Sequence, residues 1–215
     1  LQAVAKPARY TGQEWNAVHK APEQVKCTFA LSMPDVYEVG MSNLGIKILY
    51  EVLNQREDTA AERVYAPWID MEAEMRARQI PLFSLESFTE IGKFDFLGFS
   101  LQYEMIYTNV LNMLDLAGIP LQAAERGESM PFVVGGGPCV YNTEPVAEFF
   151  DLFVIGEGEE VLGELVDAFI AWKEAGRPEG RAGFLHRAAR IDGIYVPSFY
   201  EPEYDAAGNF LRLQP

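Results

Sequence analysis

Short apolar runs alternate with stretches of helical periodicity along most of the chain. Four runs lack the polar alternation of a half-exposed strand, which is typical of strands buried on both faces. Each is followed by a stretch with helix signals, and Gly118 and Gly176 stand where two of these helices should stop. The runs are residues 28–33, 94–101, 131–137 and 152–156, and the expected helices are 43–53, 107–118, 144–150 and 159–174.

Two weaker signals fill the interval between the first and second of these units. Residues 63–66 form a further strand candidate that precedes a short helix near 72–78, and residues 81–85 are a possible extra strand. Strand followed by helix about five times predicts an α/β fold with a doubly wound, mainly parallel five-stranded sheet of the flavodoxin-like type. Its crossovers should be right-handed, and ligands should bind at the carboxyl ends of its strands.

The two ends of the chain differ from this middle part. Residues 1–24 resemble an irregular arm, residues 25–175 form the α/β domain, and residues 176–215 form a connector with a β extension. Within the extension, residues 195–213 predict two β runs around a turn at 207–209, which indicates a hairpin-like element. Pro197 and Pro202 place the first run at an edge or in a connector.

Charge and composition exclude several classes of function. The 215 residues carry a formal net charge of −15, so a nucleic-acid surface formed by this domain alone is not expected, and neither is binding to anionic lipid. No stretch reaches 18 apolar residues, and no secretory signal is apparent, so neither a membrane span nor secretion is expected. Two cysteines, Cys27 and Cys139, are too few to indicate a disulfide framework, and a cytoplasmic location is the simplest expectation.

The loop after the first strand, MPDVYEVGMSNLG, holds Asp35, Glu38, Gly40 and Ser42 on the expected ligand side of the sheet. Glycine there permits a close approach of the backbone to a ligand. An ordinary turn, with Ser42 or Asn43 capping the next helix, explains the loop equally well. Both interpretations stay open.

The loop after the 131–137 run contains three consecutive glycines, Gly135, Gly136 and Gly137. Three residues without side chains at a strand end indicate a close neighbour, and the position favours a ligand over a packed helix. The G-x-x-x-x-G-K-[ST] spacing of a phosphate-binding P-loop is absent.

The last loop, GEGEE, offers Gly156 and Glu157 as ligand contacts. It fails as a dinucleotide fingerprint because Val161 stands where a glycine is required and because its carboxylates would repel a pyrophosphate. Glu159 and Glu160 are better explained as stabilising the first turn of the next helix. Glu157 precedes that helix, so a ligand or a neighbouring domain is its expected contact.

Catalytic and metal-binding signals are weak. The two histidines, His19 and His186, have no metal-ligand spacing, and no cysteine or serine has an adjacent base. Only Asp35, Glu38, Glu104 and Glu157 have catalytic promise among the carboxylates, and each is explained as well by a solvated surface. We therefore predict no catalytic residue and no metal site.

Several long motifs nevertheless resemble a known family. They are PARYTGQEWN, FALSMPDVYEVGMSNLGIKILYEVLN, AERVYAPWIDMEAEMR, FLGFSLQYEMIYTNVLNMLDLAGIPL and VVGGGPCVYNTEPVAEFFDLFVIGEGEE. This combination is similar to the N-terminal region of an uncharacterised family of cobalamin-binding-type radical SAM proteins. In that family the domain precedes a radical SAM barrel with a C-x-x-x-C-x-x-C motif for a [4Fe-4S] cluster, and that motif is absent here. The resemblance implies an excised N-terminal domain, with S-adenosylmethionine and the cluster expected only in the missing part.

The resemblance also implies a set of cofactor-binding positions. Better-known cobalamin-binding domains have D-x-H-x-x-G, S-x-L and G-G motifs. Asp35 matches the first, without its histidine, so no axial ligand to cobalt is expected from that loop. Ser100 matches the serine although Gln102 replaces the leucine, and Gly135 and Gly136 match the glycine pair. By this resemblance, the residues expected on the nucleotide tail are Ser100, Gln102, Gly135, Gly136 and Gly137, and those facing the corrin are residues 35–40 and Tyr103.

Three hypotheses follow, from different functional classes. The first is a cobalamin-type cofactor-binding module of a radical SAM enzyme of unknown substrate, whose partner is its own C-terminal radical SAM domain. The second is a degenerate scaffold that docks on the barrel or recognises a substrate without a cofactor, and it predicts an exposed apolar patch at residues 195–200. The third, a free-standing enzyme, is disfavoured by the missing nucleophile, metal site and phosphate loop.

Overall fold

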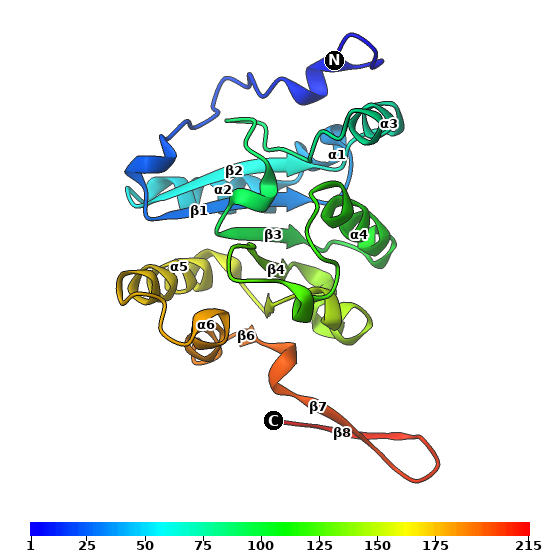
Figure 1. Cartoon of the computed structure of the whole chain (residues 1–215), viewed down its shortest axis with the longest axis vertical. Helices are drawn as coiled ribbons and strands as arrows, with labels where there is room; N and C mark the ends of the chain where they lie inside the picture. Colours follow the sequence, from blue (N-terminus) through cyan, green and yellow to red (C-terminus); the bar gives the residue numbers. More distant parts are fainter.

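A six-stranded, mainly parallel sheet forms the centre of the molecule (Figure 1). The computed structural model describes residues 1–215, apart from the side chain of Pro22. The strand order is β2-β1-β3-β4-β5-β6; strands β1 to β5 run parallel and β6 is antiparallel to β5. The strands are β1 (Cys27–Met33), β2 (Thr59–Tyr65), β3 (Phe96–Ser100), β4 (Phe132–Gly136), β5 (Leu152–Val154) and β6 (Ile194–Tyr195). The predicted α/β fold with a mainly parallel sheet is confirmed, and the count of five strands is wrong because β6 adds a short sixth strand at the edge.

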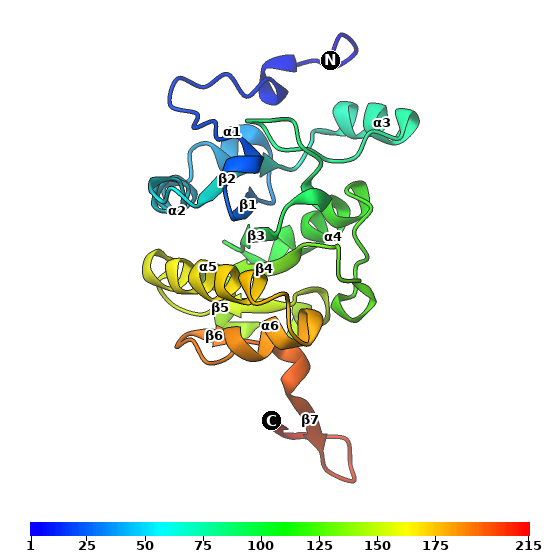
Figure 2. The ribbon, with the colours of Figure 1, turned by 60° about the vertical axis from the view of Figure 1, so that its left-hand side comes forward.

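Helices cover both faces of this sheet, which gives three layers (Figure 2). One face packs against α2, α5 and α6, and the other packs against α3 and α4. Side chains alternate between the faces along a strand, so Phe29 and Leu31 of β1 lie with α2 and α5 while Ala30 lies on the other side. The helices are α1 (Tyr37–Gly40), α2 (Leu44–Gln55), α3 (Ile69–Arg78), α4 (Tyr107–Leu116), α5 (Gly158–Glu174) and α6 (Gly180–Ala188). None of the helices in the described part of the chain is long and apolar enough to cross a membrane.

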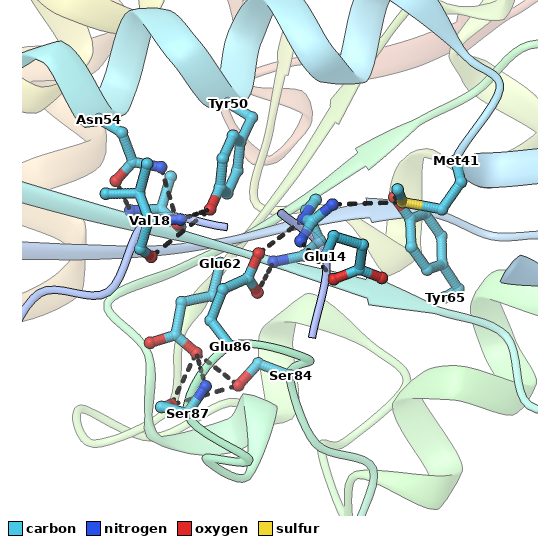
Figure 3. A network of polar contacts seen from close by, with 12 residues as sticks. Glu14, Val18, Met41, Tyr50, Asn54, Glu62, Tyr65, Ser84, Glu86 and Ser87 are labelled. Atoms are coloured by element: carbon cyan, nitrogen blue, oxygen red, sulfur yellow. Dashed lines mark hydrogen bonds and ion pairs between the residues drawn. The ribbon is translucent and has the colours of Figure 1, made fainter. Parts of the chain in front are cut away.

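The edge strand β2 is closed by side chains and a loop in place of another strand (Figure 3). The side-chain amide of Asn54 accepts from the backbone N–H of Ala61 and donates to its carbonyl, both at 3.0 Å. Two residues further along, the N–H of Arg63 donates to the Glu86 carboxylate at 2.7 Å, and the Arg63 carbonyl accepts from the N–H of Leu85 at 2.8 Å. The outward backbone groups at these two positions are therefore satisfied.

The N-terminal arm is tied to the same edge. The guanidinium of Arg63 donates to Glu14 of the arm at 3.0 Å, and the ammonium of Lys20 donates to the carbonyl of Thr59 at 2.7 Å. Burial opposes ionisation of Glu14, but a hydrogen bond from the Tyr37 hydroxyl and the charge of Arg63 hold the pKa of Glu14 below its usual value. The arm is thus part of the folded unit and covers the edge of the sheet.

Three local expectations are corrected by the structure. Strand β2 begins at Thr59, four residues before the predicted start. The added part can include the charged Glu62 because its buried carboxylate accepts hydrogen bonds from the hydroxyls of Ser84 and Ser87, each at 2.6 Å. Residues 81–85 do not form a strand. Their strand-like pairing is limited to an isolated antiparallel bridge between Phe83 and Glu90. The segment expected as a connector contains α6.

Two contacts hold α6 in place despite its glycines. Phe184 packs against Phe132 with ring centroids 4.5 Å apart, within an aromatic cluster between α5, α6 and the sheet. The guanidinium of Arg181 donates to Asp151 at 2.7 Å, and Arg126 donates to the other oxygen of the same carboxylate at 2.8 Å. These buried contacts join α6 to the start of β5.

A C-terminal hairpin is present, but its first strand starts at Glu201 and not at Tyr195, because Tyr195 pairs with Phe153 in the main sheet. Strands β7 (Glu201–Tyr204) and β8 (Phe210–Gln214) form a separate two-stranded sheet, which projects from the body (Figures 1 and 2). Tyr204 and Phe210 remain exposed on it. By contrast, the patch expected at residues 195–200 is mostly covered within the chain.

Burial accounts for that covered patch residue by residue. Val196 is buried, the Tyr195 ring stacks on Phe153 at 6.3 Å, and Phe199 stacks on His186 at 4.5 Å. Only Tyr200 is clearly exposed among the large apolar side chains of this segment. The exposed apolar patch that the scaffold hypothesis predicts at residues 195–200 is therefore mostly absent, which weakens that hypothesis.

Candidate functional site

A cavity opens at the carboxyl ends of the strands, between the sheet and the helices α2 and α5. Its volume is about 200 Å³, and apolar side chains and glycines form most of its wall. This volume lies below the roughly 300–1,000 Å³ of pockets that enclose drug-sized ligands, so the cavity suits a single ring system. The apolar side chains come from β1, α2, β4, β5 and α5: Phe29, Leu31, Ile46, Leu49, Val134, Val154 and Leu162.

The loops after β3 and β4 supply the polar part of the wall. Ser100 ends β3 opposite Gly136 of β4, and Gln102 follows two residues later. The amide nitrogen of Gln102 donates to the Ser100 hydroxyl oxygen at 2.7 Å. Ser100, Gln102, Gly136 and Gly137 all line the cavity, so the structure brings together four of the five residues predicted on the nucleotide tail.

The three consecutive glycines have different surroundings. A Cβ on Gly135 would overlap the buried ring of Phe153, so this glycine is required by packing on the opposite face of the sheet. A Cβ on Gly136 would meet nothing within 4 Å. Gly137 has φ +96°, and its Cβ would lie 3.0 Å from the carbonyl oxygen of Leu101. Only the second glycine therefore leaves open space toward the cavity.

The loop after β5 forms the opposite wall. Gly156 has φ +109° and open space around an added Cβ, and it lines the cavity together with Glu157, Gly158 and Glu159 at the start of α5. The Glu157 and Glu159 side chains are exposed, which puts two carboxylates at the mouth. Negative charge at the first turn suits the helix dipole and disfavours a phosphate group at this wall.

Residues 34–43, between β1 and α2, do not line the cavity. Asp35 accepts a hydrogen bond from the Tyr103 hydroxyl, and this carboxylate raises the pKa of Tyr103. Gly40 packs under the ring of Tyr65, and the Ser42 hydroxyl donates to the carbonyl of Val39 at 2.8 Å. Asn43, not Ser42, caps α2 by accepting from the N–H of Ile46 at 2.9 Å. These contacts favour the structural explanation for most of this loop.

Glu38 of the same loop is held by the arm. Its carboxylate accepts from Arg9 at 2.9 Å and from Lys6 at 3.2 Å. The hydrogen bond from Arg9, more than any other contact, lowers the pKa of Glu38 to about 2. Glu38 is thus paired within the chain.

Sequence reasoning missed the apolar floor of the cavity and the contribution of α2. Phe29, Leu31 and Val134 are typical residues of a buried strand, so the sequence does not indicate that they line a cavity. One signal was available: Gly45 and Gly158 lie in the first turns of the two helices beside the cavity. Leu49 closes one end by lying 3.2 Å from the position of a Cβ on Gly158.

Titratable groups elsewhere form no second centre. Among the described side chains, no three His, Cys, Asp or Glu residues gather as metal ligands would. Cys27 is fully buried in β1, and burial raises the pKa of its thiol. Cys139 is partly buried, and burial raises its pKa as well.

Comparison with known proteins places the chain in a family. The family model described as radical SAM proteins, N-terminal, matches residues 45–197, which is most of the chain. This protein belongs to that family. The matched range of the radical SAM N-terminal family contains the cavity-lining parts of α2, β3, β4, β5 and α5. It leaves out the arm, the hairpin and strand β1, which supplies Phe29 and Leu31 to the cavity.

A relative extends this picture. An uncharacterised protein of Methanocaldococcus jannaschii is 26% identical over 141 residues, which cover 64% of this chain and 26% of that protein. The radical SAM N-terminal chain therefore matches about a quarter of the length of this relative. No solved structure matches the chain.

Proposed function

We propose that this chain is the cofactor-binding N-terminal module of a radical SAM protein, and that its cavity takes the nucleotide tail of a cobalamin-type corrinoid. The observation that carries the proposal is the convergence of Ser100, Gln102 and Gly136 on one apolar cavity at the carboxyl edge of the sheet. These are positions that the resemblance assigns to the tail. Residues 25–175 form the core of the module in this proposal.

The cavity fits the tail of such a cofactor better than the whole of it. About 200 Å³ accommodates one bicyclic aromatic ring, and the larger corrin would lie outside, over the loops. Open space at Gly136 and Gly156 allows a ring to approach the backbone closely. The parallel strands follow the order 2-1-3-4-5 of flavodoxin-like folds, which bind ligands at this edge.

The residues of the chain divide between the two parts of the cofactor. Gly136, Gly137 and the Ser100–Gln102 pair would orient the tail, and Tyr103 with Asp35 would face the corrin beside the mouth. A bound corrinoid would supply its cobalt to the chemistry of the whole protein. In this proposal the binding of S-adenosylmethionine and of a [4Fe-4S] cluster belongs to the radical SAM domain, outside these residues.

Exposed apolar side chains at the carboxyl ends of the strands suggest where that radical SAM domain would lie in this proposal. Leu44, Met105 and Tyr141 follow β1, β3 and β4, and their exposed fractions are 69%, 86% and 79%. Such exposed apolar side chains favour an interaction surface. We place the radical SAM domain against these side chains, where it would cover the corrin.

Binding of hydroxocobalamin tests the proposal. The purified protein is mixed with hydroxocobalamin, and its visible spectrum is followed through gel filtration. Co-elution at tens of micromolar is expected for the native chain. Gly136→Leu should abolish co-elution because the leucine side chain enters the cavity, whereas Gly127→Leu should not, because Gly127 is exposed in a loop outside the cavity.

Two outcomes would contradict the proposal. One is the absence of co-elution with the native chain. The other is undiminished binding by a folded Gly136→Leu variant, because the corrinoid would then bind elsewhere. Far-UV circular dichroism of both variants shows whether they fold.

A further inference from the structure

Ser100 and Gln102 form a hydrogen-bonded pair on the cavity wall. The Gln102 amide lies 2.7 Å from the Ser100 hydroxyl, and both residues are half-buried and line the cavity. In the S-x-L motif of better-known cobalamin-binding domains the position of Gln102 holds leucine, which has no polar group. Gln102 therefore differs from the motif by placing a polar amide beside the Ser100 hydroxyl.

The backbone around this pair is fixed by the neighbouring loop. The N–H of Leu101 donates to the carbonyl of Gly136 at 2.7 Å, and the N–H of Cys139 donates to the carbonyl of Leu101 at 3.0 Å. A Cβ on Gly137 would lie 3.3 Å from the amide nitrogen of Gln102, so the glycine makes room for that amide. The position of Gln102 is set before any ligand enters.

The pair presents at least one donor and one acceptor whichever way the amide is oriented. When the amide N–H donates to Ser100, the hydroxyl proton of Ser100 and the carbonyl oxygen of Gln102 are left for a ligand. In the flipped orientation the hydroxyl donates to Gln102, which leaves the hydroxyl oxygen as acceptor and the amide N–H₂ as donor. A leucine at position 102 would leave the Ser100 hydroxyl alone.

We infer that the cavity selects a ring whose edge carries both an acceptor nitrogen and an amino donor, as adenine does, over a dimethylbenzimidazole. This inference rests on the proposed function in so far as the ring is the tail of a corrinoid. Glutamine pairs with the amino group of adenine and an adjacent ring nitrogen in this donor–acceptor manner in nucleic-acid recognition. In a corrinoid tail, where N7 carries the sugar, N6 and N1 offer the same donor and acceptor. An N-linked dimethylbenzimidazole has one acceptor nitrogen and no donor, so the acceptor of the pair, which is the Gln102 carbonyl in one orientation and the Ser100 hydroxyl oxygen in the other, would receive no hydrogen bond from the ring.

The opposite wall agrees with an amino-bearing ring. Glu157 and Glu159 at the mouth are hydrogen-bond acceptors and would favour an amino group over a phosphate. The apolar floor leaves the ring faces in contact with Phe29 and Val134, which suits any flat heterocycle. Selection between rings therefore depends on their edges.

Two small probes test the inference without the corrin. Binding of 7-methyladenine and of 1,5,6-trimethylbenzimidazole, each methylated at the nitrogen that carries the sugar in the corresponding corrinoid, is measured by NMR chemical-shift titration of the ¹⁵N-labelled chain. The adenine probe should bind at least about ten-fold more tightly and shift the amides of Gln102 and Gly136. Gln102→Leu should weaken adenine binding about ten-fold and leave the benzimidazole unchanged or tighter, whereas the exposed Gln122→Leu should change neither.

The outcomes separate this inference from the proposed function. Equal binding of the two probes, or a folded Gln102→Leu variant with an unchanged preference, overturns the inference even if hydroxocobalamin binds. Adenine binding that depends on Gln102, in a chain that binds no corrinoid, supports the ring selection and overturns the corrinoid proposal. A corrinoid with an adenine tail that binds more tightly than hydroxocobalamin supports both.

Discussion

Alanine substitution of the three consecutive glycines, one at a time, should lower the unfolding free energy at Gly135 and Gly137 and raise it at Gly136. Gly135→Ala places a methyl group against the buried ring of Phe153, which cannot move freely in its cluster with Phe150. Such overpacking costs about 1–3 kcal/mol of unfolding free energy. Gly137→Ala forces alanine to φ +96° and ψ −175° and against Leu101, and this backbone region, which is essentially restricted to glycine, costs an L-residue about 1–3 kcal/mol.

Gly136→Ala should behave in the opposite way. Its Cβ meets open space, and its backbone lies in β4 without a positive φ. Restricting the unfolded chain should raise the unfolding free energy by about 0.4–1 kcal/mol. The opposite signs of the two changes in unfolding free energy therefore distinguish Gly135, which is required by packing, from Gly136, which faces the cavity.

Urea denaturation followed by circular dichroism measures these differences. Because a chain of this size changes its melting temperature by about 2–4 °C for each kcal/mol, thermal melts provide a second reading. A loss of unfolding free energy in Gly136→Ala as large as that in Gly135→Ala would contradict this prediction. Unchanged m-values would show that the native states remain comparably compact.

Two further predictions concern ion pairs. Asp151→Ala leaves the buried guanidiniums of Arg126 and Arg181 without their shared carboxylate, so we expect a loss of about 3–5 kcal/mol in urea denaturation; a loss no larger than that of the exposed Asp192→Ala would contradict this. The folded-state pKa of Glu38, about 2, lies below its ordinary value of 4.5, so its pairing with the arm contributes stability above about pH 4.5 and loses it as the pH falls toward 2. The difference in melting temperature between the native chain and Glu38→Gln should therefore shrink over that interval, and a difference that stays constant down to pH 2 would rule out this pairing as the cause.

Strong apolar runs made much of the fold predictable. Strands β1, β3, β4 and β5 and helices α2, α4 and α5 lie where runs and periodicity place them. The sequence predicts too short a strand at β2 because Ala60, Ala61 and Glu62 have low strand propensity. The hydrogen bonds that compensate for this come from Asn54, Ser84 and Ser87 elsewhere in the chain. No local window of sequence contains those partners.

Helix α6 was missed for a similar reason. Gly180 and Gly183 each lower helix propensity by about 1 kcal/mol relative to alanine. The contacts that offset this loss, Phe184 in the aromatic cluster and Arg181 on Asp151, are made across the tertiary structure. Propensity alone therefore favoured a connector.

The site was predictable in part. Chain order shows that Ser100, Gly136 and Gly156 end parallel strands, and the carboxyl ends of such strands lie at one edge of the sheet. Whether a strand-end glycine has open space beside it depends on neighbours such as Phe153, which lies against Gly135 only after folding. The glycine pattern alone could not distinguish Gly135 from Gly136.

The closed edge at β2 has a consequence for self-association. Strand addition requires unpaired backbone groups, and at Ala61 and Arg63 those groups are already bonded to Asn54, Glu86 and Leu85. The hairpin of β7 and β8, with its apolar side chains exposed, has free edges outside the main sheet. Cross-strand pairing between copies, and any aggregation by that route, should therefore start from the hairpin and leave the β2 edge of the main sheet untouched.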